Sequence, residues 1–370
     1  MEFKEYNLFC GGRFAVGSLT EENGIITGIK IHAEGKNPSL PCLLPGLIDL
    51  HTHGAAGADF SDGDYEGLRR MAAFYAKNGV TSFAPASMTL PYDVLAKAFS
   101  TAVALREERP EGLATLQGIH MEGPFFSEKK KGAQNGAYLR NPDFEAFRAL
   151  EEGCDGLIKI VDVAPELPGA AEFTAGASKL CRVSVAHTDA DYAAAAAFFK
   201  AGATHLTHLF NAMPGIHHRN PGVIGAASEC ESVTAELITD GLHVHESAVR
   251  MAFKLFSGRI CLISDSLRCA GMPEGSYSLG GQTVYLKNGS ARLADGTIAG
   301  SVISLWEGMR NAISFGIDEN DAILAATLRP AKELGVADTI GSLEAGKRAD
   351  FVICDGSYAV KDVFIGGKAI

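Results

Sequence analysis

From residue 46 onward the sequence alternates between short β-rich apolar runs and stretches with helical periodicity. Eight candidate strands share this pattern: Leu47–His53, Val80–Ala86, Ala114–Met121, Leu157–Ala164, Arg182–His187, His205–Leu209, Val233–Thr239 and Arg259–Asp265. Strands that alternate with helices are typical of parallel sheets, and eight such units favour a closed barrel. The sequence therefore predicts an α/β fold with a TIM-like (β/α)8 barrel.

Helical patterns lie between most of these strands. The stretch Tyr65–Asn78 has apolar residues at helical spacing and ends at Gly79, a residue typical of helix C-caps. Similar patterns occur at Pro91–Glu107, Asp189–Lys200 and Ser247–Phe256. The competing fold is a doubly wound open sheet. It is disfavoured because no G-x-G-x-x-G motif follows the first candidate strand.

The two ends of the chain depart from this alternation. Residues 1–45 contain short strand-like pieces separated by turns, and residues 336–370 contain alternating runs at Asp350–Cys354 and Val360–Ile365. The two ends of a domain often lie close together in space. We therefore expect residues 1–45 and 336–370 to form a small β-sandwich domain beside a barrel of residues 46–335.

Composition limits the partners and the compartment of the protein. The net charge is −11 and the longest basic run is Lys129–Lys131, so we expect no nucleic-acid surface. No apolar run reaches the ~18 residues of a membrane span, and the N-terminus lacks the layout of a signal peptide. None of the 8 cysteines forms a C-x-x-C pair, which favours reduced thiols in a cytoplasmic protein.

Polar side chains gather where the candidate strands end. Five strands end in imidazole or carboxylate groups, which belong to His51, His53, His120, Glu122, His187, His205, His208 and Asp265. The C-terminal strand ends form the active-site face of a (β/α)8 barrel, so we expect these groups on one rim. A lone histidine at a strand end is more often a hydrogen-bonded structural residue, and Asp265 alone could be a helix N-cap. Their number favours a shared site.

The types of side chain indicate which ion such a site would hold. Imidazole nitrogen combined with carboxylate oxygen suits zinc or iron(II) rather than magnesium or calcium. A catalytic site keeps a position open for water, and the metal lowers the pKa of that water to about 7. A neighbouring carboxylate can then take the proton and pass it to a leaving amine. Asp265 is the candidate for this role.

Longer motifs resemble those of a known enzyme superfamily. The segment PGLIDLHTHG (45–54) is similar to the P-G-x-x-D-x-H-x-H opening of the amidohydrolase superfamily, and GSLEAGKRADFVICD (341–355) resembles its C-terminal signature. The motifs between them are similar, in the same order, to those of the N-acetylglucosamine-6-phosphate deacetylase family. They are HMEGPFF, KKGAQN, APE, THLFNAMP, DGLHV and SDSLRCAG.

This resemblance implies hydrolysis of the acetamide of N-acetyl-D-glucosamine 6-phosphate to D-glucosamine 6-phosphate and acetate, in amino-sugar catabolism. It also implies a homodimer with one or two zinc or iron(II) ions per subunit. Glu122, His187 and His208 would bind one metal ion. His51 and His53 would bind a second, with Glu122 bridging the two. Asp265 would be the catalytic acid and base.

The resemblance also implies a set of substrate contacts. They are Ala133, Gln134, Asn211, Ala212, Arg219, His243 and the backbone of Ile298, Ala299 and Gly300. Arg219 would reach the phosphate from the neighbouring subunit. Gln134 replaces a histidine that contacts phosphate in many family members, and Arg268 is a candidate for supplying the missing charge. His120 or His243 could stabilise the oxyanion.

Other functions remain open from the sequence alone. The substrate could be a different N-acetylated amino sugar, such as the galactosamine 6-phosphate, an N-acyl amino acid or a cyclic amide. A barrel that senses amino-sugar phosphates without catalysis is a further alternative. The sensor is disfavoured because every ligand position and Asp265 are intact.

Overall fold

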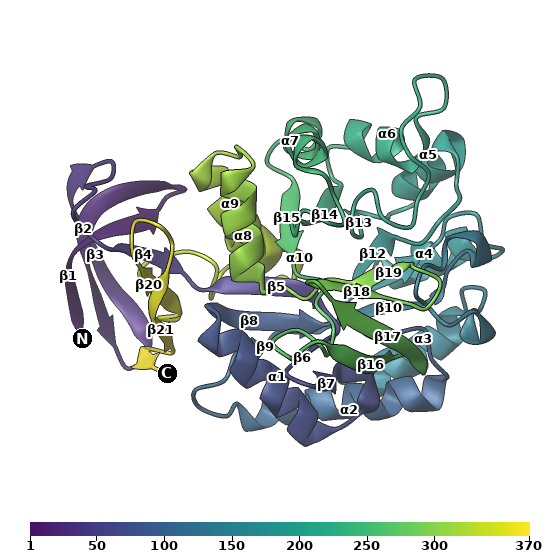
Figure 1. Ribbon diagram of the computed structural model, residues 1–370, viewed down its shortest axis with the longest axis horizontal. Helices are drawn as coiled ribbons and strands as arrows, with labels where there is room; N and C mark the ends of the chain where they lie inside the picture. The colour runs from purple at the N-terminus through teal and green to yellow at the C-terminus, as the bar shows by residue number, and fades with distance from the viewer.

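The computed structural model describes residues 1–370 and confirms an α/β fold built on a ring of parallel strands (Figure 1). The ring contains β5 (Leu47–Thr52), β8 (Val80–Pro85), β10 (Ile119–Phe125), β11 (Ile158–Val163), β12 (Arg182–Val185), β13 (His205–Leu206), β14 (Thr234–Ile238) and β15 (Ile260–Ile263). Strands β10 to β15 form one sheet, and β5 and β8 form another with β9 (Thr115–Leu116). A bridge between Ala86 and His120 joins the two sheets. The Asp265 amide donates to the His51 carbonyl at 3.0 Å, which links the end of β15 to β5.

Seven of the eight predicted strands contain one of these segments, whereas the third was wrong in its limits. The predicted run Ala114–Met121 covers β9 and only the start of β10. Gly123 and Pro124 favour turns in sequence analysis, yet β10 continues through them because Phe125 pairs with Val163 of β11. Glu122 therefore lies inside a strand, with its backbone held on a rigid element.

The helices lie on the outside of the ring. They are α1 (Tyr65–Lys77), α2 (Tyr92–Glu108), α3 (Phe144–Gly153), α4 (Ala170–Ala177), α5 (Tyr192–Lys200), α6 (Gly222–Glu229), α7 (Glu246–Leu255), α8 (Leu305–Ser314), α9 (Glu319–Ala326) and α10 (Leu328–Glu333). The predicted helices correspond to α1, α2, α5 and α7. The start of α5 was predicted at Asp189, but the side chain that caps this helix belongs to Asp191. No helix combines the length and the apolar character needed to cross a bilayer.

Both ends of the chain contribute to a second sheet beside the barrel (Figure 1). Its strands are β1 (Glu2–Cys10), β2 (Arg13–Glu22), β3 (Ile25–Glu34), β4 (Cys42–Pro45), β20 (Phe351–Cys354), β21 (Val360–Ile365) and β22 (Lys368–Ala369). Strand β4 joins the two ends because it pairs with β1 on one side and with β20 on the other. Leu8, Leu43 and Phe351 are fully buried in its core. The domain limits 1–45 with 336–370, and 46–335, stay a prediction.

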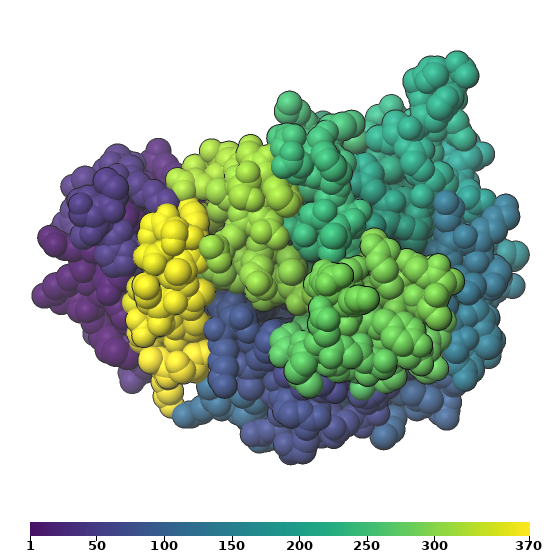
Figure 2. Space-filling view, viewed as in Figure 1, coloured from purple at the N-terminus to yellow at the C-terminus, as the bar shows by residue number.

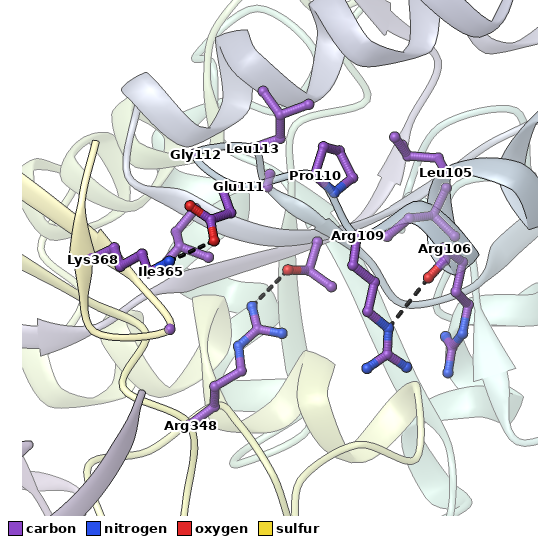
Figure 3. A pocket seen from close by; sticks show the side chains of 14 residues that line it. Leu105, Arg106, Arg109, Pro110, Glu111, Gly112, Leu113, Arg348, Ile365 and Lys368 are labelled. Atoms are coloured by element: carbon purple, nitrogen blue, oxygen red, sulfur yellow. Dashed lines mark hydrogen bonds and ion pairs between the residues drawn. The ribbon is translucent and has the colours of Figure 1, made fainter. Parts of the chain in front are cut away.

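This sheet contacts the barrel where β9 begins. Arg348 donates to the Thr115 hydroxyl at 2.6 Å, and Lys368 pairs with Glu111 (Figure 3). A cavity of about 240 Å³ lies between these contacts. Its lining contains no histidine and no cysteine, so this cavity is distinct from the predicted rim.

A small antiparallel sheet covers part of the barrel on the face seen in Figures 1 and 2. It contains β16 (Gly275–Leu279), β17 (Gln282–Lys287), β18 (Ser290–Arg292) and β19 (Ile298–Gly300). Leu279 and Val284 of this sheet pack in one buried cluster with Met88 and Leu267. The packing brings the end of β19 to the rim. The remaining short elements are β6 (Gly54–Ala55), β7 (Ala58–Asp59), η1 (Phe60–Asp62), η2 (Glu128–Lys130) and η3 (Gly136–Tyr138).

Candidate metal centre

Five strands bring the candidate ligands to one end of the barrel. His51 lies in β5, His53 follows β5, Glu122 lies in β10, and His187, His208 and Asp265 follow β12, β13 and β15. His51 and His53 are two residues apart on an extended segment, so their side chains point to the same side. The structure places all six side chains around one point.

Glu122 lies at the centre of this cluster. Its Oε1 is 3.2 Å from Nε2 of His187 and 3.2 Å from Nε2 of His208. Its Oε2 is 3.2 Å from Nε2 of His53. Two sets of ligand atoms that include Glu122 have all members within 4.8 Å of one another: Glu122 with His187 and His208, and Glu122 with His51 and His53. One carboxylate is therefore shared by two ligand sets.

Asp265 lies beside the second of these sets. Its Oδ1 is 3.3 Å from Nε2 of His53 and 3.7 Å from Nε2 of His51. The Asp265 side chain is nearly buried and lines the cavity above the ligands. It is placed to act on a group held between the histidines and the cavity.

The donor atoms fit a divalent cation. Nε2 of His51 is buried and has no hydrogen-bond partner. The Nε2 atoms of His187 and His208 lie 3.1 Å apart, and both face Glu122. Leaving a buried polar atom unpaired costs ~1–3 kcal/mol. Imidazole nitrogens that converge on a carboxylate form the donor set of catalytic zinc sites.

Three of the six residues around the cluster adopt a left-handed backbone conformation. The φ angles are 44° at His187, 30° at His208 and 47° at Asp265. This conformation costs a residue with a Cβ atom ~1–2 kcal/mol, and such residues concentrate at functional sites. Each of the three lies two residues beyond the end of a barrel strand, where the sharp turn leaves its side chain at the cluster.

The imidazoles control the charge of both carboxyl groups. Burial opposes the ionisation of Glu122, but His53, His187 and His208 outweigh it and hold the pKa of Glu122 well below its usual range. Burial also opposes the ionisation of Asp265, but the hydrogen bond from His53 and the charge of His51 keep the pKa of Asp265 below its usual value. Both carboxyl groups are therefore ionised at neutral pH.

A cavity of about 180 Å³ opens beside the ligands. Its lining includes eight of the predicted substrate contacts: Ala133, Gln134, Asn211, Ala212, His243, Ile298, Ala299 and Gly300. Met88, Gly132 and Thr297 also line it and were missed by sequence analysis. Gly132 and Thr297 are direct neighbours of predicted residues, so a wider reading of the same motifs would have included them. No lysine or arginine lines the cavity.

Two of these lining residues are held by specific hydrogen bonds. Gln134 accepts the Thr89 amide at 2.8 Å and donates to Oε2 of Glu122 at 2.6 Å. Its side-chain amide thus supports the ligand carboxylate directly. Nδ1 of His243 is bonded to Asp240 at 2.6 Å, which leaves Nε2 of this ring for the cavity.

Three residues considered in sequence analysis lie outside the cavity. Arg219 is exposed on the loop between β13 and α6, which projects from the body of the molecule (Figure 2). Arg268 does not line the cavity and pairs with Asp62 at 2.7 Å, which compensates its charge. The expectation that Arg268 faces a phosphate is therefore not supported. Both ring nitrogens of the buried His120 are engaged inside the barrel, which removes it as an oxyanion donor.

A second polar layer lies beneath the ligands inside the barrel. Glu236 of β14 is bonded to Nδ1 of His51 at 2.9 Å and to Nε2 of His205 at 3.1 Å. Nδ1 of His205 faces Glu333 at 2.9 Å. Glu236 was not among the site residues predicted from the sequence. A carboxyl group inside the apolar run TAELI is the signal that would have identified it, because isolated charges are rarely buried.

Comparison with known proteins places this geometry in a family. Residues 42–370 match the model of the amidohydrolase family. The N-acetylglucosamine-6-phosphate deacetylase of Bacillus subtilis is 40% identical over 87% of this chain and 83% of its own. The N-acetylgalactosamine-6-phosphate deacetylase of Escherichia coli O157:H7 is 34% identical over 94% of this chain and 92% of its own.

A solved structure is similar to this chain over its whole length. A point mutant of N-acetyl-D-glucosamine-6-phosphate deacetylase from Mycobacterium smegmatis, in complex with N-acetyl-D-glucosamine 6-phosphate, superposes with a TM-score of 0.93. It is 30% identical to this chain, and the match covers 100% of this chain and 98% of the other.

His205 makes a testable contribution to stability. Burial opposes its charge, but hydrogen bonds to Glu236 and Glu333 raise its pKa to about 9. A histidine whose pKa is raised by folding stabilises the protein fully at pH values below its pKa in the unfolded state, about 6.5. This stabilisation is lost as the pH rises through the pKa of the folded state. We compare the free energy of unfolding of wild type and His205→Gln by urea denaturation. The difference between them should shrink as the pH rises from about 6.5 to about 9.

The exposed His32 provides a control for this experiment, because His32→Gln is expected to leave the free energy of unfolding unchanged at every pH. A difference between wild type and His205→Gln that stays constant across the range would contradict a charged His205.

Proposed function

The chain belongs to the amidohydrolase family, and we propose that it hydrolyses the acetamide of N-acetyl-D-glucosamine 6-phosphate to D-glucosamine 6-phosphate and acetate. One observation carries this proposal. Glu122 is shared by two sets of imidazoles, and Asp265 lies beside them in a cavity lined by residues from the deacetylase motifs. The names of the B. subtilis and M. smegmatis relatives support the same substrate.

We propose zinc or iron(II) as the metal, with one or two ions per subunit. Glu122, His187 and His208 would hold one ion, and His51 and His53 would hold the other together with Glu122. When bound, such a cation lowers the pKa of a coordinated water to about 7 and polarises the carbonyl of the substrate.

Asp265 acts as base and acid in this proposal. Its ionised carboxylate faces the cavity, so it can accept the proton of the attacking water on an Oδ atom. It then passes this proton to the nitrogen of the acetamide as the C–N bond breaks. The backbone N–H of Asp265 donates to the His51 carbonyl at 3.0 Å, which fixes the position of this residue beside the ligands.

His243 is the proposed polar contact to the sugar. Its hydrogen bond to Asp240 orients the ring, and that bond, despite burial, keeps the pKa of Asp240 low. With Nδ1 donating to Asp240, Nε2 of His243 is left to accept a hydrogen bond from a hydroxyl group of the sugar. The backbone of Ile298, Ala299 and Gly300, which also lines the cavity, would enclose the sugar.

The phosphate of the substrate requires a cation that this cavity does not supply. No lysine or arginine lines it, whereas Arg219 is exposed on a projecting loop of the same chain. We propose a homodimer in which the partner subunit's Arg219 reaches the phosphate. A guanidinium group suits this role because it can bind a phosphate with two parallel hydrogen bonds.

A second candidate substrate is N-acetyl-D-galactosamine 6-phosphate. The E. coli O157:H7 relative named for that sugar matches nearly the whole chain. The two sugars differ only in the configuration at C4, so the same ligand set and the same Asp265 would serve both. Comparison of kcat/KM for the two substrates decides between them.

The reaction itself gives the first test. We expect the purified protein to release acetate from N-acetyl-D-glucosamine 6-phosphate faster than from the unphosphorylated sugar. A chelator is expected to abolish this activity, and zinc or iron(II) to restore it. Bound metal without acetate release from either phosphorylated sugar would refute the proposal.

Asp265→Asn separates chemistry from metal binding. Because the amide cannot accept the proton, we expect kcat to fall by about 10²–10⁴-fold, while the metal content measured by atomic emission stays at the wild-type level. Asp62→Asn, at an exposed carboxylate outside the cavity, serves as the control. Near-normal turnover in Asp265→Asn would exclude Asp265 as the acid and base.

Arg219→Ala tests the phosphate contact. Loss of a hydrogen bond to a charged group costs ~1.5–3 kcal/mol, so KM for the phosphorylated sugar should rise by about tenfold to a hundredfold. The KM for the unphosphorylated sugar should change little. Arg268→Ala is the matched control, since that arginine pairs with Asp62. Equal effects of Arg219→Ala on both substrates would argue against a phosphate contact.

A further inference from the structure

Glu236 is a charged residue that the proposed chemistry does not use. It is fully buried in β14, directly beneath the candidate ligands. Its Oε2 is bonded to Nδ1 of His51 at 2.9 Å and accepts the backbone N–H of His208 at 3.1 Å. Its Oε1 is bonded to Nε2 of His205 at 3.1 Å. A buried carboxylate is tolerated only when it is paired in this way.

The bond to Glu236 determines which nitrogen of His51 is available to a metal ion. A carboxylate can only accept, so Nδ1 of His51 is the donor. Nε2 is left facing Glu122 and Asp265, each at 3.7 Å, with no hydrogen-bond partner. Metal-binding histidines commonly donate their other N–H to a carboxylate, which orients the ring and raises its basicity.

A row of alternating charges keeps Glu236 ionised. Both ring nitrogens of His205 face carboxylates, Glu236 on one side and Glu333 on the other, so both nitrogens carry hydrogen and the ring is positively charged. Glu333 pairs in turn with the half-exposed Arg182 at 3.1 Å. The row runs from beneath the ligands to the opposite end of the barrel.

Among the candidate ligands, only His51 has a carboxylate behind its ring. Nδ1 of His53 contacts a backbone carbonyl at 3.2 Å, and Nδ1 of His187 contacts another at 2.8 Å. Nδ1 of His208 has no hydrogen-bond partner. Glu236 therefore bonds directly to the ring of one ligand, His51, and contacts a second ligand, His208, only through the backbone N–H.

We propose that Glu236 is a positioning residue that orients His51 and increases its basicity, and thereby sets the affinity of the His51–His53–Glu122 set for a divalent cation. His51, His120 and Glu236 also lie close enough together to hold an ion. Their facing atoms are already hydrogen-bonded to one another or to neighbouring groups, so Glu236 has an orienting role here. The inference rests on the proposed function only in requiring a cation at the His51–His53–Glu122 set.

Titration of the metal-free protein with Co²⁺ tests this role without an activity measurement. Calorimetry and the visible spectrum of Co²⁺ report each binding step, and His53→Asn and His187→Asn assign the steps to the two ligand sets. We expect wild type to bind two ions. In Glu236→Gln, which keeps the shape and loses the charge, the ion at the His51–His53–Glu122 set should bind about 10–100-fold more weakly. The other ion should be unaffected.

Glu151→Gln is the matched control, because Glu151 is a buried carboxyl group outside the metal centre that accepts a backbone N–H at 3.0 Å. It should bind both ions like wild type. A folded Glu236→Gln that binds both ions like wild type, or that loses both equally, would overturn the inference. If Glu236→Gln does not fold, Glu333→Gln removes the next carboxylate of the row. Selective weakening of the same ion supports the proposal, and unchanged binding overturns it.

Wild-type protein that binds a single ion, at Glu122, His187 and His208, would also overturn the role of Glu236. That result would leave the proposed hydrolysis intact, because acetate release is measured separately. Loss of the proposed function and loss of this inference are therefore distinguishable.

Discussion

The pairing of the buried Glu122 carboxylate with imidazoles from three other strands is the interaction on which the candidate site depends. A charge removed from water costs several kcal/mol unless it is fully paired. That pairing requires His53, His187 and His208 to converge on two oxygen atoms. Convergence from strands so far apart in the sequence requires a closed ring. The left-handed turns at His187 and His208 then bring these side chains into position at a local conformational cost.

The interior of the barrel beneath the ligands is polar, unlike that of most barrels. Barrel interiors are usually filled by layers of branched apolar side chains. Here His120, Asp162, His205 and Glu236 are fully buried beneath the ligands and bonded to one another or to neighbouring groups. Hydrogen bonds inside a protein interior restrict the arrangement of the side chains that they join. The lower layer therefore supports the orientation of the ligands, and a simple apolar filling could not do so.

Much of this arrangement was predictable from local sequence patterns. Apolar runs that end in histidine or carboxylate identified the strands and the six side chains at their ends, because strand ends in a parallel barrel share one rim. The remainder depends on distances between residues far apart in the sequence. Arg268 has its charge compensated by Asp62, and His120 is directed into the barrel. Neither fact is visible in a motif. Glu236 was missed because its apolar neighbours read as an ordinary core strand.

Anomalous X-ray diffraction from crystals of zinc-loaded protein, collected at the zinc absorption edge, tests the central claim most directly. We predict a peak within about 2.0–2.2 Å of a Glu122 oxygen and of the Nε2 atoms of His187 and His208, the bond lengths of protein zinc sites. A strongest anomalous peak among other residues, with Glu122, His187 and His208 bonded only to one another, would contradict a metal-centred hydrolase.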